Sequence, residues 1–213
     1  MIAVLDYGIG NLRSAERALI HLGADARLVT HPDSAVGAAG IVLPGVGAFG
    51  ACADALRRSG LDEVANHALR EGTPFLGICI GFQLLYEGSE EAPGTEGLGA
   101  LPGTVRALPL AVKSPQMQWN TLRRRSGVTG GLLGGLDEDP WVYFVHSFAP
   151  EDGVDVVATC DYGGEVTAAV ERGSLWGTQF HPEKSGPVGL AILDNFIRAC
   201  DSFGTGGAAP SGT

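Results

Sequence analysis

The chain has 213 residues, of which 45% are hydrophobic and 18% are charged, and its formal net charge is −10. A chain of this length and apolar content buries one sizeable core, which argues against disorder, and its acidity argues against nucleic acids and anionic membranes as partners. No apolar run has the length of a membrane span and the N-terminus lacks a secretory signal pattern, so we expect a cytoplasmic protein.

The first 80 residues alternate short apolar runs with segments of helical period, which is the pattern of a parallel sheet with helices on its faces. Residues 1–7 form the first expected strand, and Asn11 is placed to cap a helix that ends at Leu22. The other elements expected in this part are strands at 26–30, 40–43 and 73–79, helices at 52–56 and 61–70, and a loop at 44–50.

After Tyr86 the pattern changes, and residues 88–103 are rich in acid and turn formers, which predicts a surface excursion. An amphipathic helix is expected at 188–200. We therefore predict an α/β fold with a mixed, largely parallel sheet flanked by helices, in a domain of residues 1–201 followed by a flexible tail at 202–213. Short β-type runs are expected at 105–108, 121–124, 141–145, 154–160, 166–171 and 175–180, and this half is expected to add antiparallel strands to the parallel sheet.

The sequence GICIG at 77–81 follows an apolar strand and precedes the helix-like segment FQLLYEG. A nucleophile on a sharp strand-to-helix turn needs small neighbours, because the turn crowds the backbone. We interpret Cys79 as a nucleophile whose thiolate is favoured by the helix N-terminus, with the Ile80 N–H as an oxyanion donor. The alternative is a buried structural cysteine. No catalytic, disulfide or metal-binding role is expected for Cys52, Cys160 and Cys200.

A cysteine nucleophile needs a base, and two of the five histidines, His146 and His181, end apolar runs. His181 opens an HPE sequence whose proline stiffens the turn, so Glu183 can fold back toward the ring. This pattern predicts a triad of Cys79 as nucleophile, His181 as base and Glu183 as the acid that orients it. The alternatives are a solvated Glu183 and a core role for His146.

The segment PGVG at 44–47 also follows a strand, so it is a candidate for a second oxyanion donor at the same sheet edge. The alternative is an ordinary turn. The GIGNL segment after the first strand lacks the GxGxxG spacing and the lysine of a phosphate loop, which disfavours nucleotide binding.

Six longer segments complete the pattern: DYGIGNL at 6–12, LPGVGAFG at 43–50, GICIGFQLL at 77–85, MQWN at 117–120, YFVHSF at 143–148 and GTQFHPEKSG at 177–186. Together they resemble the class I, triad-type glutamine amidotransferases, and among these the family of glutaminase subunits of imidazole glycerol phosphate synthase. The likeness spans most of residues 1–200. Two positions depart from the family pattern, since Gln118 stands where glycine is usual and Ile80 where leucine is frequent.

The resemblance implies a flavodoxin-like fold and hydrolysis of glutamine to glutamate and ammonia through a thioester on Cys79, without a cofactor or metal. His181 would move the protons and Glu183 would hold its tautomer. Val46 or Gly47 would join Ile80 in the oxyanion hole. The substrate-binding positions that it implies are Gly45, Gln83, Ser147 and Phe148.

The resemblance also implies a partner, a (β/α)8-barrel cyclase subunit in a heterodimer. This partner would use the ammonia to make imidazole glycerol phosphate and aminoimidazole carboxamide ribonucleotide in histidine biosynthesis. The expected interface residues are Asn11, Trp119, Asn120 and Lys184. Two alternatives stay open, namely a glutaminase subunit of another amidotransferase such as pyridoxal phosphate synthase, and a non-catalytic regulatory subunit on the same fold.

Overall fold

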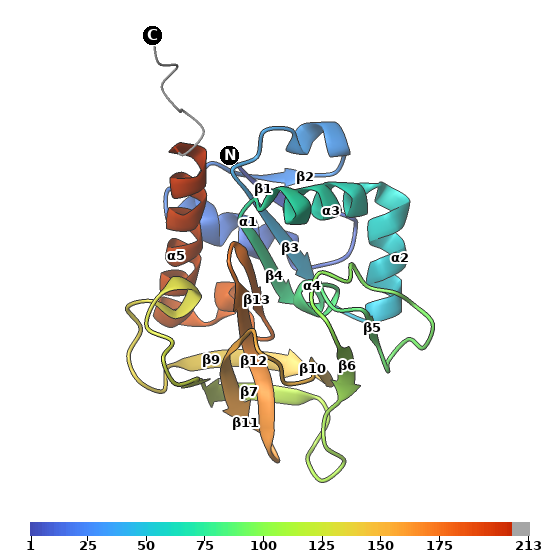
Figure 1. Cartoon of the computed structure of the whole chain (residues 1–213), viewed down its shortest axis with the longest axis vertical. Helices are drawn as coiled ribbons and strands as arrows, with labels where there is room; N and C mark the ends of the chain where they lie inside the picture. The colour runs from blue at the N-terminus through green and yellow to red at the C-terminus, as the bar shows by residue number, and fades with distance from the viewer. Residues whose placement is uncertain (206–213) are drawn as a thin grey trace.

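The structure, a computed structural model, describes residues 1–205 and is built around an eight-stranded mixed sheet (Figure 1). Five neighbouring strands are parallel, in the order β2 (Ala26–Val29), β1 (Ile2–Leu5), β3 (Gly40–Gly45), β4 (Phe75–Cys79) and β13 (Leu175–Thr178). The antiparallel strands that continue the sheet are β12 (Glu165–Arg172), β11 (Val156–Asp161) and β8 (Arg123–Arg124). The predicted mixed, largely parallel sheet is confirmed.

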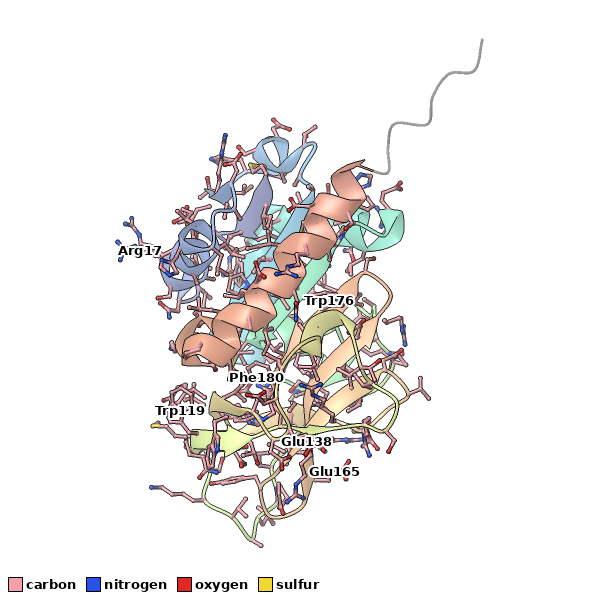
Figure 2. All side chains as sticks on the ribbon, turned by 90° about the vertical axis from the view of Figure 1, so that its left-hand side faces the viewer. Arg17, Trp119, Glu138, Glu165, Trp176 and Phe180 are labelled. Carbon is pink, nitrogen blue, oxygen red and sulfur yellow. The ribbon has the colours of Figure 1, made fainter. Side chains whose placement is uncertain are left out.

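Helices cover both faces of this sheet (Figures 1 and 2). The helices α1 (Leu12–His21) and α5 (Gly186–Thr205) contact each other on one face, and α2 (Phe49–Ser59) and α3 (Leu61–Glu71) pack together on the other. Asn11 precedes α1 as expected, but its side chain accepts a hydrogen bond from the Ser14 hydroxyl and caps no backbone N–H. Three short 3-10 turns are also present, η1 (Pro32–Ala35), η2 (Gly131–Leu133) and η3 (Pro182–Lys184), together with a single helical turn, α4 (Ile80–Gln83).

Two smaller sheets lie beyond the lower end of the parallel strands in Figure 1. One contains β5 (Gly88–Ser89), β6 (Thr104–Ala107) and β10 (Phe148–Pro150), and the other pairs β7 (Gln116–Thr121) with β9 (Trp141–His146). The strand β7 was not expected, although its sequence QMQWNT alternates polar and apolar residues. Its burial is inverted relative to the usual pattern, since Gln116 points inward and is fully buried, whereas Met117 and Trp119 are exposed. The three-residue strand β10 was also not expected.

The prediction of a loop over 44–50 is wrong at both ends, since β3 continues to Gly45 and α2 begins at Phe49. Proline fits this strand because β1 pairs with β3 only as far as Val42, so the missing N–H of Pro44 removes no bond to β1. The loop is therefore limited to residues 46–48.

Aromatic contacts connect the elements of the C-terminal part of the core. Phe144 of β9 packs edge-to-face on Phe180, with 5.8 Å between ring centroids, and Trp176 of β13 packs on Phe196 of α5. These contacts fix the segment that follows β13. Within residues 1–205 no helix combines the length and apolar character needed to cross a membrane. The helix α5 continues to Thr205, the domain boundary at 201–202 stays a prediction, and residues 206–213 of the expected tail lie outside the described part.

Candidate active site

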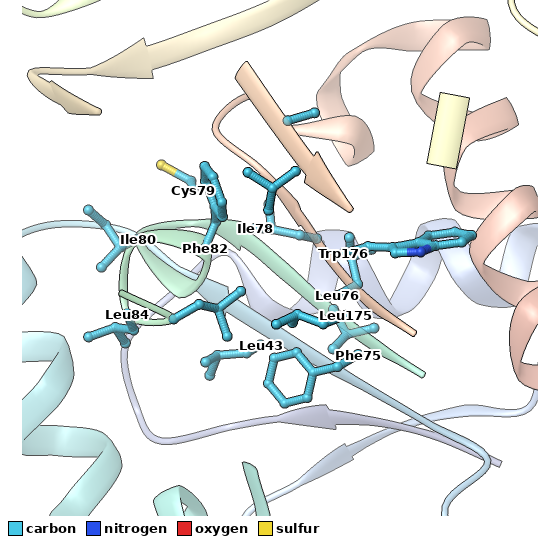
Figure 3. Packing of buried hydrophobic residues seen from close by; sticks show 14 of the residues in the cluster. Leu43, Phe75, Leu76, Ile78, Cys79, Ile80, Phe82, Leu84, Leu175 and Trp176 are labelled. Atoms are coloured by element: carbon cyan, nitrogen blue, oxygen red, sulfur yellow. The ribbon is translucent and has the colours of Figure 1, made fainter. Parts of the chain in front are cut away.

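Cys79 is the last residue of β4 and precedes a single helical turn, α4 (Ile80–Gln83). Its backbone lies at φ 55° and ψ −111°, a conformation that side chains rarely adopt and that the surrounding structure must enforce. The glycines that flank it are required: a Cβ on Gly81 would lie 1.8 Å from the Leu43 carbonyl oxygen, and one on Gly77 would lie 2.8 Å from the Phe82 backbone. In Figure 3 the sulfur points away from the apolar side chains of β4.

The prediction of a helix over FQLLYEG is wrong, because the helix α4 ends at Gln83. The carbonyls of Leu84, Leu85 and Tyr86 accept hydrogen bonds from the backbone of residues 98–101, so they do not continue the helical ladder. A single turn has only a small macrodipole. Stabilisation of a thiolate at Cys79 therefore has to come from neighbouring groups.

His181 and Glu183 form a buried pair beside Cys79. The Nδ1–H of His181 donates to Oε1 of Glu183 at 2.8 Å, and the two side chains are 2% and 3% exposed. Burial opposes the charged imidazole, but hydrogen bonds and charges from Cys79 and Glu183 outweigh it and raise the pKa of His181 to about 9. His181 Nε2 has no hydrogen-bond partner within residues 1–205, so this nitrogen can take up or release a proton.

Cys79 and His181 line one cavity of about 220 Å³, although they come from distant parts of the chain. They meet because β4 and β13 are parallel neighbours, so both strands end at the same sheet edge. Glu183 joins them through His181. The six residues predicted for the oxyanion hole or for substrate binding that line the same cavity are Val46, Gly47, Ile80, Gln83, Ser147 and Phe148, and Lys184 from the predicted interface lines it as well.

Gly45, also predicted to bind substrate, lies beneath the cavity and is not part of its lining. A Cβ there would lie 2.8 Å from both the Gly81 nitrogen and the Tyr7 hydroxyl, so the glycine permits β3 to approach the turn at Cys79. Gly45 pairs with Cys79 in the sheet. Its place in the structure is thus that of a support under the nucleophile.

The oxyanion segment, residues 44–47, is held by buried donors. The Tyr7 hydroxyl donates to the Pro44 carbonyl at 2.7 Å, and the Cys52 thiol donates to the Val46 carbonyl at 3.3 Å. The carbonyl and N–H of a trans peptide point in opposite directions. Because the Val46 carbonyl points toward Cys52, the Gly47 N–H of the same peptide points away from the Cys52 thiol. Gly47 has φ 97°, which favours glycine at this position.

His146 is buried at 5% exposure, and its Nδ1–H donates to the Phe148 carbonyl at 2.9 Å. Burial, together with the charge of the nearby His181, lowers the pKa of His146 to about 4, so the ring is neutral at pH 7. Gln83 donates from Nε2 to the same carbonyl at 2.8 Å. Both side chains therefore fix the Phe148 backbone at the wall of the cavity.

Three cavity residues were missed from the sequence, namely Glu91, Pro115 and Val145. Glu91 accepts a hydrogen bond from the Phe49 N–H at 2.8 Å, which brings the acidic excursion back to the start of α2. Nothing in the acidic run distinguishes this glutamate from its neighbours. No cluster of three or more histidine, cysteine or acidic side chains suited to a metal ion occurs within residues 1–205.

The outer face of the β7–β9 sheet is apolar and lies beside the cavity. Met117, Trp119 and Trp141 are 62%, 48% and 57% exposed, and Val145, paired with Met117, lines the cavity. Trp119 lies at the surface in Figure 2. Of the other expected interface residues, Lys184 is exposed at the cavity and Asn11 is half-buried, whereas Asn120 donates to the Asp161 carbonyl at 2.9 Å.

Comparisons with known proteins agree with this site. The family described as glutamine amidotransferase class-I matches residues 3–200. The imidazole glycerol phosphate synthase subunit HisH of Desulfitobacterium hafniense is 45% identical over 198 residues, covering 92% of this chain and 93% of that protein. The subunit of the same name from Methanothermobacter thermautotrophicus is 48% identical over 198 residues, covering 92% and 98%.

A solved structure described as a glutamine amidotransferase has the same fold, with a TM-score of 0.74 at 21% identity and coverage of 94% of this chain and 98% of the other. The fold, the cavity at the strand ends and these relatives agree: the chain belongs to the class I glutamine amidotransferases and, within them, to the HisH subunits of imidazole glycerol phosphate synthase.

Proposed function

We propose that the chain hydrolyses the side-chain amide of glutamine at the Cys79 cavity and passes the ammonia to a cyclase subunit. The observation that carries the proposal is that His181, hydrogen-bonded to the buried Glu183, lines one cavity with a cysteine on a strained turn. The cytoplasmic location expected from the sequence stays part of this proposal.

The first half of the reaction forms a thioester. His181 takes the thiol proton of Cys79 onto Nε2, and its raised pKa of about 9 keeps the proton there at neutral pH. The thiolate attacks the amide carbon of glutamine, so that an S–C bond forms and the amide oxygen gains negative charge. The Ile80 N–H and one N–H of the oxyanion segment, from Gly47 or from Val46 after a peptide rotation, stabilise this oxygen.

The second half releases both products. His181 donates the Nε2 proton to the amide nitrogen, the C–N bond breaks, and ammonia leaves a γ-glutamyl thioester on Cys79. Neutral His181 then removes a proton from water, whose oxygen attacks the thioester carbon. The C–S bond breaks, which releases glutamate and restores the thiolate and the imidazolium. Glu183 keeps Nδ1 protonated throughout, so Nε2 does all the proton transfer.

The amino-acid end of glutamine finds matching groups at the other side of the cavity. Oε1 of Gln83 is buried and accepts no hydrogen bond from residues 1–205, and Glu91 adds a carboxylate. These two acceptors suit the α-ammonium group of the substrate. Backbone groups of Ser147 and Phe148 line the same wall.

Ammonia is soon protonated and lost at neutral pH, so we place the partner over the cavity. The exposed apolar face of β7 and β9 suits a subunit interface beside it, and Trp119 and Lys184 are the residues we expect at its centre. The partner of this proposal is a (β/α)8-barrel cyclase that makes imidazole glycerol phosphate and aminoimidazole carboxamide ribonucleotide. The relatives of 45% and 48% identity favour it over a pyridoxal phosphate synthase partner.

Glutamate release by the purified complex tests the chemistry. Cys79→Ala abolishes it, whereas Cys160→Ala, which changes a buried thiol outside the cavity, leaves it intact. A diazo-ketone analogue of glutamine labels Cys79 alone among the four cysteines. Label spread over all four cysteines, or no label with the partner present, would favour a binding subunit, and hydrolysis that survives Cys79→Ala would refute the proposed role of Cys79.

Co-purification with candidate cyclases tests the partner. We expect the imidazole glycerol phosphate synthase cyclase to bind, and a pyridoxal phosphate synthase subunit not to bind. Glutamate release then rises when the cyclase ligand is added, because the oxyanion segment rotates its donor into place. An isolated chain that is already as fast as the liganded complex would contradict this rotation.

A further inference from the structure

A chain of hydrogen bonds runs from the wall of the cavity to the nucleophile. Gln83 Nε2 donates to the Phe148 carbonyl at 2.8 Å and to Gln179 Oε1 at 3.0 Å. Gln179 Nε2 then lies 3.8 Å from Cys79 Sγ, within donor distance of a sulfur. Gln179 is fully buried and was not singled out from the sequence.

The direction of this chain is fixed by its first member. A backbone carbonyl only accepts, so Gln83 must turn its NH2 group toward Phe148. The same NH2 group faces Gln179, which must therefore present its oxygen to Gln83 and its own NH2 group to Cys79. The usual ambiguity between the oxygen and nitrogen of an amide is thus resolved by the network.

We infer that Gln179 is a further catalytic residue, whose side-chain amide donates a hydrogen bond to the reacting sulfur and stabilises the thiolate of Cys79. The inference rests on the proposed function in placing the reaction at this sulfur. A hydrogen bond to an ion is stronger than one to a neutral thiol, so the amide favours the charged state. As a thiol, Cys79 faces the Val145 carbonyl at 4.0 Å, an acceptor that offers nothing to a thiolate.

Few groups near Cys79 can stabilise its thiolate. The helix after Cys79 has one turn, so its dipole is small. The titratable groups that face the sulfur are His181, with Glu183 behind it, Tyr7 from the segment after β1, and Cys52 from α2. His181 gives up its proton during the reaction, whereas the Gln179 amide carries its hydrogens at every step. It therefore supports the sulfur both as nucleophile and as leaving group.

The test is the pH dependence of Cys79 alkylation by iodoacetamide in the intact complex, followed by peptide mass spectrometry. In Gln179→Met, which keeps the side-chain size but lacks the donor, we expect the midpoint of the rate to rise by about one pH unit. The alkylation rate at pH 7 and kcat for glutamine should each fall about tenfold, with KM within about twofold of wild type. Gln179→Glu, of the same shape but with a negative charge toward the sulfur, should raise the midpoint further.

The chain offers a matched control, because Gln116 Nε2 lies 3.7 Å from the sulfur of Cys160 in a second buried pair outside the cavity. Gln116→Met should leave the Cys79 midpoint and kcat unchanged. A wild-type midpoint in folded Gln179→Met would overturn the inference, and if that variant does not fold, a wild-type midpoint in Gln179→Glu would do so. Alkylation needs no glutamine, so a shifted midpoint in a complex that releases no glutamate would refute the proposed function alone.

Discussion

The N-terminal half of the molecule, residues 1–87, and the C-terminal half, residues 88–205, hold their reacting groups in different ways. The N-terminal half places Cys79 by packing: its strands β1, β3 and β4 are buried throughout, and the turn after β4 admits only small neighbours. The C-terminal half places its groups by hydrogen bonds: His181 donates to Glu183, and Gln179 accepts from Gln83 of the N-terminal half and donates to the sulfur.

The two halves meet at the contact between β4 and β13, where Ile78 pairs with Thr178. This pairing brings Gln179 and Cys79 together across 100 residues of chain. We therefore expect changes of side-chain volume to destabilise the N-terminal half most, and changes of charge or of a hydrogen-bond donor to destabilise the C-terminal half most. Each half can therefore be perturbed by a different kind of substitution.

The largest effect is expected from added volume at the turn after Cys79. In Gly81→Ala the new Cβ would lie 1.8 Å from the Leu43 carbonyl oxygen, which is backbone and cannot move aside. We expect the free energy of unfolding to fall by more than about 3 kcal/mol, measured by urea denaturation. Gly153→Ala, where nothing lies within 4 Å of the Cβ, is the control. Equal stabilities of the two variants would mean that packing does not place Cys79.

The sequence predicted the N-terminal half almost fully, because its strands are apolar runs and its helices have clear periods and glycine ends. The misses have local causes. The helix after Cys79 ends because the backbone N–H groups of residues 98–101 donate hydrogen bonds to the carbonyls of residues 84–86. These hydrogen bonds form only in the folded chain. In the C-terminal half, β7 was missed although its residues alternate, and the outward direction of its apolar side chains could not be predicted from the alternation alone.

The site divides in the same way. Cys79, His181 and Glu183 were predicted because their spacing in GICIG and HPE has a mechanical reason, and the structure brings them to one edge. Glu91 and Gln179 reach the site through tertiary contacts that have no local signal. The positions of residues at such turns can thus be predicted from the sequence, whereas contacts made from a neighbouring strand require the fold.

The second prediction uses charge in the C-terminal half. The folded pKa of His181, about 9, lies above the ordinary value of 6.5, so its contribution to stability is complete below pH 6.5 and is lost as the pH rises through 9. We expect wild-type stability to fall by up to about 3 kcal/mol over this range from His181. In Glu183→Gln the fall is smaller, because one source of the raised pKa is gone. Parallel stability curves of the two proteins would contradict this assignment.

The third prediction compares an exposed apolar side chain of each half for its effect on cyclase binding. Trp119→Ser removes an exposed aromatic side chain beside the cavity, and we expect it to weaken cyclase binding by about 2 kcal/mol, roughly 30-fold in Kd, measured by calorimetry. Its free energy of unfolding should change by less than about 0.5 kcal/mol. The control is Val36→Ser, since Val36 is 82% exposed in the N-terminal half. Equal losses in both variants would argue against an interface on β7 and β9.

The smallest effect compares two tyrosine hydroxyls that each donate to a carbonyl. Tyr7 holds the Pro44 carbonyl at 2.7 Å in the buried N-terminal half, and Tyr162 holds the Lys113 carbonyl at 2.6 Å at the surface of the C-terminal half. Tyr7→Phe should cost about 1 kcal/mol of unfolding free energy, because Pro44 is left without a partner away from water. In Tyr162→Phe water replaces the hydroxyl, so the cost should be below about 0.5 kcal/mol. Since only Tyr7 supports the oxyanion segment, a fall in kcat is expected for Tyr7→Phe alone, and an equal fall in both variants would remove that role from Tyr7.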